Sequence, residues 1–223
     1  MPMVRAMRVL NAIEAGTLSG SALETLLAGD AGRLAELTQL LQLRGQCRRL
    51  AASSTAMNAV IASSTAMNAV AASSTAMNAV AASSTAMNAV AASSTAKMAV
   101  FNSDTALNAI AGSATAMAAA RAASQYSVVS WTENGATPVS LTLTGTHHIV
   151  LGASRNASIA RAVTLTTLRS GTTVSGTTPS TAAVASTTAT DFNVAIPLVS
   201  PHTARLSGSG SVTSYLGILR CDV

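Results

Sequence analysis

A ten-residue unit dominates the middle of the chain. It reads AASSTAMNAV at 51–60, IASSTAMNAV at 61–70, and AASSTAMNAV again at 71–80 and 81–90. Three weaker copies follow, AASSTAKMAV at 91–100, FNSDTALNAI at 101–110 and AGSATAMAAA at 111–120. Tandem units of constant length are typical of repeat architectures, in which each unit is completed by its neighbours. These repeats therefore decide the fold.

The repeats have the composition of a helix. Ala and Met favour helix, and no proline occurs between 51 and 120. We expect a continuous helix of about 105 Å over this segment. Such a helix would leave an apolar edge in water, so we expect a coiled-coil-like shaft in which three identical chains associate. The predicted shaft core is Met57, Val60, Met67, Val70, Met77, Val80, Met87 and Val90.

Two alternatives to the helical trimer remain open at this point. The apolar pattern does not exclude a dimer. If each ten-residue unit makes three helical turns, the helix has about 3.3 residues per turn, which is tighter than the 3.6 of an α-helix and counts against the helical prediction. Because Ser, Thr and Val also suit strands, a stacked β-solenoid is the rival to the helix.

Residues 1–50 have the pattern of short amphipathic helices. Ser21 and Glu24 fit a capping box, and Asp30 can cap a second helix. Two such helices cannot bury their apolar faces alone, so we expect this segment to dock on another protein. The predicted anchor residues are Leu23, Leu26, Leu34, Leu37 and Leu41.

Residues 121–223 are rich in Thr, Ser, Val and Gly. Runs with period-two alternation, such as 139–144 and 162–168, are separated by turn signals such as Asn134-Gly135. About eight short strands in a hundred residues predict a β-sandwich or jelly-roll tip. The predicted fold class is thus α+β and fibrous, with short helices at 1–50, a helical shaft at 51–120 and an all-β tip at 121–223.

The composition argues against an enzyme. Charged residues make up only 9% and aromatic residues 2% of the 223 residues. No pair of carboxylates fits acid–base catalysis and no nucleophile elbow is present, so we expect no catalytic residue and no cofactor. The net charge of +5 lacks the basic face with stacking aromatics that nucleic acid needs. No apolar run is long enough for a spanning helix, and no signal peptide is evident.

A few residues in the last segment could form sites. His147, His148 and His202 could hold a metal around a threefold axis, although exposed or hydrogen-bonded histidines are the simpler interpretation, and we predict no metal site. Tyr126 and Trp131 could stack on a sugar ring, which makes them possible glycan contacts. Cys47 and Cys221 lie at opposite ends of the chain and are expected to stay unpaired, as in a reducing cytoplasm.

A helical start, a repetitive shaft and a Ser/Thr-rich β tip together resemble a tailed-bacteriophage virion fibre. The residues that carry the resemblance are the tandem SSTAMNAVAA units and NAIEAGTLSGSALETLLAGDAGRLAELTQLLQLRG at 11–45. The resemblance implies a homotrimer that is made in the host cytoplasm and located in the virion. It also implies an N-terminal segment attached to other virion proteins of the tail, neck or capsid, and a tip turned outward.

The expected function is therefore structural, namely a fibre that carries a β-rich tip for weak, multivalent attachment to a host-surface glycan. A capsid or neck decoration protein without a host-binding role is one alternative. A bacterial surface adhesin is the other, although it would need a signal peptide and an anchor.

Overall fold

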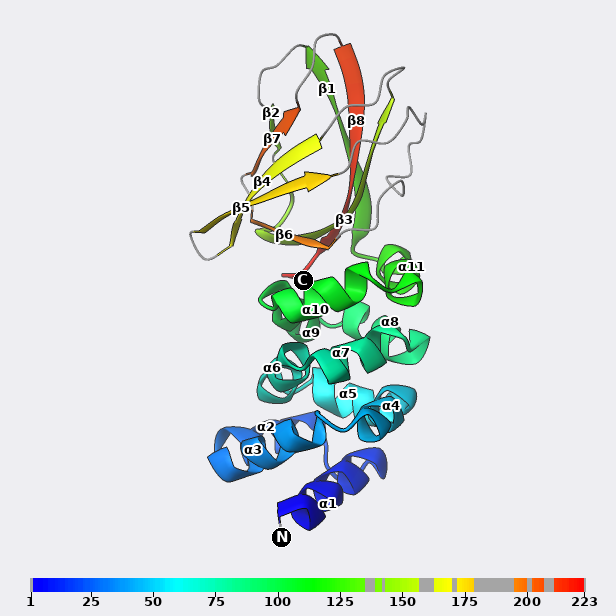
Figure 1. Cartoon of the computed structure of the whole chain (residues 1–223), viewed down its shortest axis with the longest axis vertical. Coiled ribbons are helices and arrows are strands. Elements are labelled where there is room, and N and C mark those ends of the chain that lie inside the picture. The colour runs from blue at the N-terminus through cyan, green and yellow to red at the C-terminus, as the bar shows by residue number, and fades with distance from the viewer. Residues whose placement is uncertain are drawn as a thin grey trace. The chain divides into compact units, whose positions relative to one another are not determined.

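The computed structural model describes residues 2–134, 139–141, 143–156, 163–169, 172–178, 195–199, 202–206 and 211–222. The chain divides into two compact units, Met1–Ala120 and Arg121–Val223. The first unit is helical and contains the N-terminal segment together with all seven repeats (Figure 1). No helix in the described part of the chain is both long and apolar enough to span a membrane.

The helices of the chain are all short. Four precede or enter the repeats: α1 (Pro2–Glu14), α2 (Gly20–Ala28), α3 (Ala31–Leu40) and α4 (Arg44–Ala52). Each decapeptide then contributes one helix of eight or nine residues: α5 (Ser54–Ile61), α6 (Ser64–Ala72), α7 (Ser74–Ala81), α8 (Ser84–Ala92), α9 (Ser94–Phe101), α10 (Asp104–Ala111) and α11 (Ala114–Ala122).

The first serine of each SST triplet separates one helix from the next. Ser83, for example, has an extended backbone with φ −108° and ψ 117°, and its hydroxyl accepts a hydrogen bond from the Ala86 N–H. The same cap recurs from Ser53 to Ser103. A serine at this position satisfies one of the free N–H groups at a helix start, so the chain turns once in every decapeptide.

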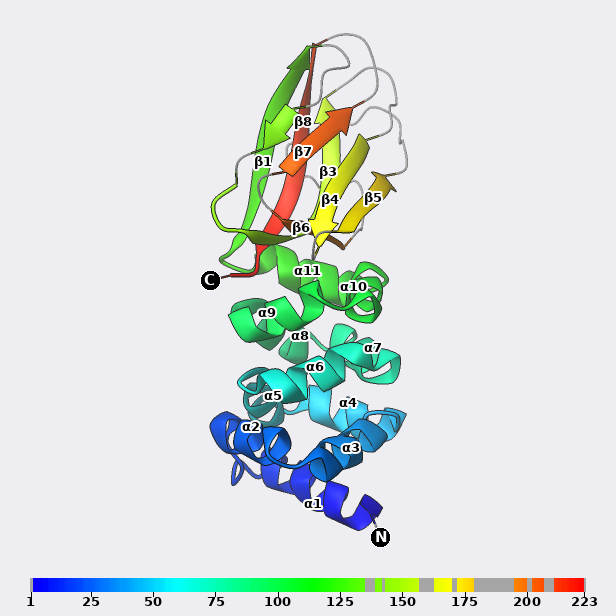
Figure 2. The same cartoon turned by 90° about the vertical axis from the view of Figure 1, so that its left-hand side faces the viewer.

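The short helices coil into a solenoid with three helices per turn. From α4 to α10, successive helices contact one another, and each also contacts the helix three places away, as in the pairs α4 with α7 and α5 with α8. Figures 1 and 2 show the helices of this unit stacked in successive layers. The capping serines also join the layers, because the Ser83 hydroxyl donates to the Ala51 carbonyl oxygen, 32 residues earlier, at 2.6 Å.

This bond repeats along the solenoid and forms a ladder. Its members are Ser73 to Leu41, Ser83 to Ala51, Ser93 to Ile61, Ser103 to Ala71 and Ser113 to Ala81, with oxygen–oxygen distances between 2.5 and 3.3 Å. Most of these carbonyls lie in the last turn of a helix, where no partner exists within the helix. One serine thus caps the start of its own helix and completes the end of another.

The predicted shaft-core residues are buried within one chain. Met57, Val60 and the equivalent residues of the next three repeats have at most 2% of their surface exposed. The alanine before each methionine is buried as well, and Lys97 takes the place of methionine in α9 with 1% exposure. The positions that face water carry Ala, Ser and Asn, as in Ala52, Ser54 and Asn58.

The expected coiled-coil shaft is therefore wrong. Helices of eight or nine residues replace the continuous helix, because the capping serine breaks the helix in every unit. With neighbouring helix layers about 8–10 Å apart, seven repeats rise only about 20–25 Å. The apolar edge does not need sister chains, since the next turn of the same chain covers it. The rival β-solenoid is also wrong, because the repeating unit is helical.

The N-terminal helices close the first end of the solenoid. Asp30 caps α3 as predicted, by accepting from the Gly32 and Arg33 N–H groups. The capping box at Ser21 is wrong, because Ser19 caps α2 and Glu24 reaches the start of α6 instead. The missing side chain of Gly20 permits this contact, since a Cβ there would lie 2.3 Å from that of Ala62.

The second unit is built from antiparallel strands. One sheet has the order β1-β8-β3-β6 and the other β2-β7-β4-β5. Its strands are β1 (Tyr126–Asn134), β2 (Val139–Leu141), β3 (His147–Asn156), β4 (Val163–Arg169), β5 (Thr172–Thr178), β6 (Ile196–Val199), β7 (His202–Leu206) and β8 (Ser211–Arg220).

Strand β8 lies between β1 and β3 in the first of these sheets. Its Leu216, Ile218 and Leu219 are buried, together with Ile149 and Val150 of β3. The predicted combination of a long shaft and a β-sandwich tip is wrong for the chain as a whole, which has short helices followed by small four-stranded antiparallel sheets. Period-two alternation locates strands, but it does not specify how sheets are arranged.

Candidate functional site

A groove with two arginines lies on the first unit between α4 and α7. Arg44 and Arg48 stand one turn apart on α4, so both side chains lie on the same face of that helix. Thr75 and Asn78 of α7 line the opposite side, and Ala79 and other alanines line the rest. The groove has a volume of about 620 Å³. Small side chains leave this space open, because four of the residues that line it are alanines.

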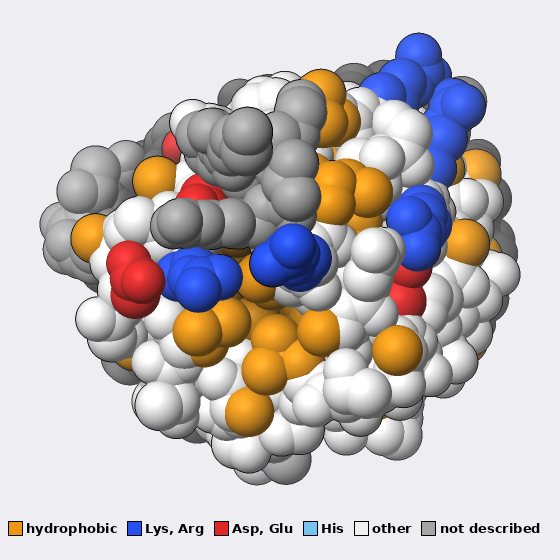
Figure 3. Space-filling view, turned by 90° about the horizontal axis from the view of Figure 1, so that it is seen from below, with side chains coloured by type: hydrophobic (Ala, Val, Ile, Leu, Met, Phe, Trp, Pro, Cys, Tyr) orange, Lys and Arg blue, Asp and Glu red, His pale blue; other side chains and the backbone are white. Residues whose placement is uncertain are grey.

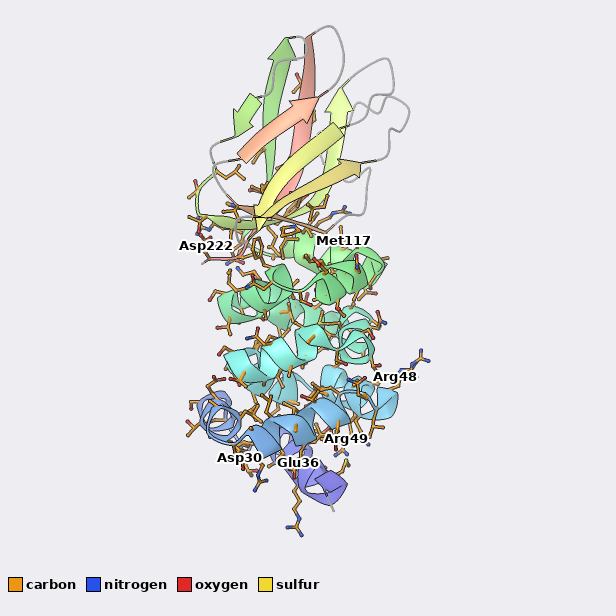
Figure 4. The ribbon with its side chains drawn as sticks, turned by 60° about the vertical axis from the view of Figure 1, so that its left-hand side comes forward. Asp30, Glu36, Arg48, Arg49, Met117 and Asp222 are labelled. Carbon is orange, nitrogen blue, oxygen red and sulfur yellow. The ribbon has the colours of Figure 1, made fainter. Side chains whose placement is uncertain are left out.

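The two arginines give the groove an uncompensated positive charge. Arg33 pairs with Asp30 and Arg49 pairs with Glu14, but Arg44 and Arg48 form no ion pair with any described residue. Both are exposed, and Arg48 extends away from the helices in Figure 4. Guanidinium groups on a neutral floor can bind carboxylate or phosphate groups by paired hydrogen bonds.

The predicted anchor residues are mostly used inside the unit. Leu23, Leu37 and Leu41 are buried, whereas Leu26 and Leu34 remain partly exposed. Figure 3 shows the face of the molecule at the α1 end, where hydrophobic side chains gather in the middle with Lys and Arg side chains around them. The surface that residues 1–50 offer to a partner is therefore a mixed one, with the Arg44–Arg48 groove as its most charged feature.

A second hollow lies on the β unit, beside the turn that precedes β3. It has a volume of about 480 Å³. Its polar lining includes Gln125, Thr144, His148 and Arg220. Val129, Leu143 and Ile218 supply an apolar part. We call this hollow the His148 pocket.

The histidine of this pocket is buried and only half satisfied. The His148 side chain is 1% exposed, and its Nε2 lies 3.0 Å from the Thr144 carbonyl oxygen. Among the residues that the structure describes, its Nδ1 has no hydrogen-bond partner, and neither has the buried Oε1 of Gln125. Burial lowers the pKa of His148, and this effect outweighs the Thr144 hydrogen bond. The ring is therefore neutral at pH 7.

The turn beside the pocket is held by an acid. Asp222 accepts hydrogen bonds from the N–H and the hydroxyl of Thr146, at 2.5 and 2.9 Å. Burial opposes ionisation of Asp222, but the Thr146 hydrogen bonds outweigh it and lower the pKa to about 2. Gly145 has φ +92°, and a side chain there would collide with Asp222 and Arg220. The turn is thus fixed against the end of β8.

The histidines do not come together as metal ligands. His148 is buried, His147 is partly exposed on the same strand, and His202 lies in β7 of the other sheet. The part of the chain that the structure describes contains no group of three or more residues able to hold a metal ion. Cys47 and Cys221 are both buried, and they form no disulfide with one another.

The two predicted glycan contacts lie in β1 at different places, and Tyr126 is one of the residues that line the His148 pocket. Tyr126 lies across β8, where a side chain on Gly217 would meet its ring and hydroxyl. Residues opposite one another on paired strands share a face, so Tyr126 shares a face with Leu219, and His148 shares the opposite face with Arg220. Trp131 lies opposite Ser214.

Sequence reasoning missed both hollows. Arg44 and Arg48 are close in sequence, but the neutral α7 wall that completes the groove is about 30 residues away and depends on the solenoid turn. His148 was considered only as a metal ligand, whereas Gln125 carried no signal at all. The register between β3 and β8 places His148 directly opposite Arg220, and only the folded chain shows this pairing.

The comparisons with known proteins identify no relative. No protein-family model matches the chain, and no curated protein shows significant similarity to it.

Proposed function

We propose that this protein is a structural component of a tailed-phage virion, in which the solenoid is a spacer and the β unit serves attachment to a host surface. One observation carries the structural part of this proposal. Seven near-identical repeats bury their apolar residues in their own chain and join their layers by the serine ladder. Such a solenoid is stabilised by nearest-neighbour contacts and its length scales with the number of repeats.

The surface of the repeats supports a mechanical role. Between residues 51 and 120 the only charged residues are Lys97, which is buried, and Asp104. Apart from Asp104, the exposed positions are mainly Ala, Ser, Thr and Asn, which offer no concentrated charge or large apolar patch to a ligand. A neutral, repetitive exterior suits a spacer better than a recognition surface.

The virion part of the proposal is supported by the resemblance of residues 11–45 and of the decapeptides to phage fibre proteins. The two arginines of the groove lie within the proposed attachment segment and give it a positive surface, whereas the opposite wall of the groove belongs to the repeats. We propose that this groove faces carboxylate groups of another virion protein. The role is mechanical and uses avidity rather than catalysis.

Localisation on particles tests this function. Antibody raised against the purified chain, detected with gold on phage particles released by the host strain that carries the gene, should label the head, neck or tail. Labelling at a single fixed site, with the chain present in purified particles by mass spectrometry, supports the proposal. Particles that lack the chain would overturn it. Labelled particles whose adsorption is unchanged by the antibody would favour the decoration role.

A further inference from the structure

We infer that the His148 pocket binds an acidic saccharide, with sugar hydroxyls on His148 and Gln125 and the sugar carboxylate on Arg220. This inference rests on the proposed attachment function and gives it a site and a ligand class. The pocket includes one of the two predicted aromatic contacts, Tyr126, and adds polar and charged groups that the sequence did not indicate.

His148 supplies a hydrogen-bond acceptor. A carbonyl oxygen can only accept, so the contact between Nε2 and the Thr144 oxygen requires that Nε2 carries the proton. The neutral ring then has a lone pair at Nδ1, and this atom has no partner. Buried polar atoms are nearly always satisfied in folded proteins, so an unpaired acceptor on a side chain that lines a hollow calls for a donor.

Gln125 supplies a second acceptor in the same pocket. Its Oε1 is buried without a partner, and its backbone carbonyl accepts from the Arg220 N–H at 3.2 Å. The two acceptors therefore come from opposite sides of β8, with Gln125 beside β1 and His148 on β3. A ligand with several hydroxyl donors can satisfy both, and saccharides have this chemistry.

Arg220 supplies the charge. It lies directly opposite His148 across the β3–β8 ladder and forms no ion pair with any described residue. The nearby Asp222 keeps its negative charge, but it accepts its hydrogen bonds from Thr146 and forms no ion pair with Arg220, so the guanidinium donors remain open to a ligand. A guanidinium of this kind binds a carboxylate by paired, charge-assisted hydrogen bonds.

The remaining lining narrows the ligand class. Val129, Leu143 and Ile218 offer an apolar patch, which suits the C–H face of a sugar ring. The volume of about 480 Å³ lies within the range of about 300–1,000 Å³ of small-ligand pockets. A phosphate ion consists mostly of acceptor oxygens. It would therefore supply too few donors for Nδ1 of His148 and Oε1 of Gln125, and its oxygens would be repelled by their lone pairs. A ligand with both donors and one acid group fits all of the lining.

The test uses the full chain and digalacturonate as the probe. In ¹⁵N-labelled protein, the Nδ1 resonance of His148 should shift on addition of digalacturonate, because the nitrogen gains a hydrogen-bond donor. Arg220→Gln should weaken digalacturonate binding about tenfold in calorimetry, and should leave the weaker binding of the neutral disaccharide cellobiose unchanged. Gln125→Leu should weaken both. Arg33→Gln, in the other unit, is the matched control and should change neither, because Arg33 pairs with Asp30 and lines neither hollow.

The inference would be overturned if Nδ1 did not respond to digalacturonate at millimolar concentration. Equal binding by wild type and Arg220→Gln, with unchanged backbone spectra, would also overturn it. A chain that is found on virions but binds neither saccharide would leave the proposed function standing and remove only this site. Saccharide binding by a chain that is absent from virions would support this site and overturn the proposed function.

Discussion

At the scale of the residue, the serine at the third position of each repeat determines the architecture. Its hydroxyl accepts from its own helix and donates to the carbonyl 32 residues earlier. One side chain therefore fixes both where the helix begins and which layer lies beside it. The second serine of the SST triplet, by contrast, is exposed and takes no part in the ladder.

The two serines of one repeat provide a matched pair of variants. Ser83→Ala removes the bonds to Ala86 and Ala51, and we expect it to lower the free energy of unfolding by about 1–2 kcal/mol. Ser84→Ala should change it by less than about 0.5 kcal/mol, because that residue is exposed. Urea unfolding followed by circular dichroism measures both. Equal stability of the two variants would show that the ladder contributes nothing.

Glu24 makes the stability depend on pH. Its carboxylate accepts from the hydroxyl of Ser63 and from the N–H and hydroxyl of Thr65, and these bonds lower its pKa from 4.5 to about 2. The ionised form is thus favoured by folding. Its contribution is complete above pH 4.5 and is lost as the pH falls toward 2.

Glu24→Gln isolates this contribution. At pH 7 we expect the variant to be less stable than wild type by about 1–2 kcal/mol. The difference should shrink as the pH falls below 4.5, because only the wild type then loses its charged cap. Thermal unfolding at pH values from 7 to 3 measures it. A difference that stayed constant over that range would contradict the assigned role.

At the scale of the element, the repeats show what sequence can and cannot predict. The period, the helical composition and the burial of Met57 and Val60 all follow from the repeated letters. The break at Ser53 does not stand out, because serine is also tolerated within a helix and the sequence between breaks still has helical spacing. The partner of each serine lies 32 residues away and cannot be found from local pattern.

Partners that are distant in sequence also explain why the capping box was wrong and why the His148 pocket was not predicted. Glu24 stands three residues after Ser21, so the local pattern favoured a capping box, but its partners are 39–41 residues distant. The orphan Nδ1 of His148 depends on a turn at Thr144 and on a register between β3 and β8. The turn and the register are known only from the folded chain, whereas the period-two alternation of polar and apolar residues predicts the strands themselves.

Insertion of further repeats tests whether each decapeptide adds one short helix to the solenoid or extends one continuous helix. Three added consensus units after residue 90 would complete one more turn, so every later helix would keep a neighbour of the same sequence. We expect the folded unit to lengthen by about 10 Å, the spacing of one helix layer. A continuous helix would lengthen by about 45 Å. Small-angle X-ray scattering of the full chain distinguishes these increments.

At the scale of the whole molecule, the chain has two separate sets of buried residues. Each unit of the chain has its own buried residues, from Leu23 to Met117 in the first and from Ile149 to Leu219 in the second. The first unit therefore has no need of sister chains to cover its repeats. Oligomerisation, if the virion uses it, would depend on surfaces other than the apolar edge of the decapeptides.

The central claim is that one chain stacks α5 against α8, and spin labels on equivalent positions measure this most directly. Asn58 and Asn88 are both exposed on these contacting helices. In an Asn58→Cys, Asn88→Cys variant with both native cysteines replaced by serine, nitroxide labels should show strong dipolar broadening, since adjacent helix layers are about 10 Å apart. Samples diluted with unlabelled chain should broaden equally. A spectrum equal to the sum of the two singly labelled variants, as expected for sites about 45 Å apart on one long helix, would contradict the solenoid.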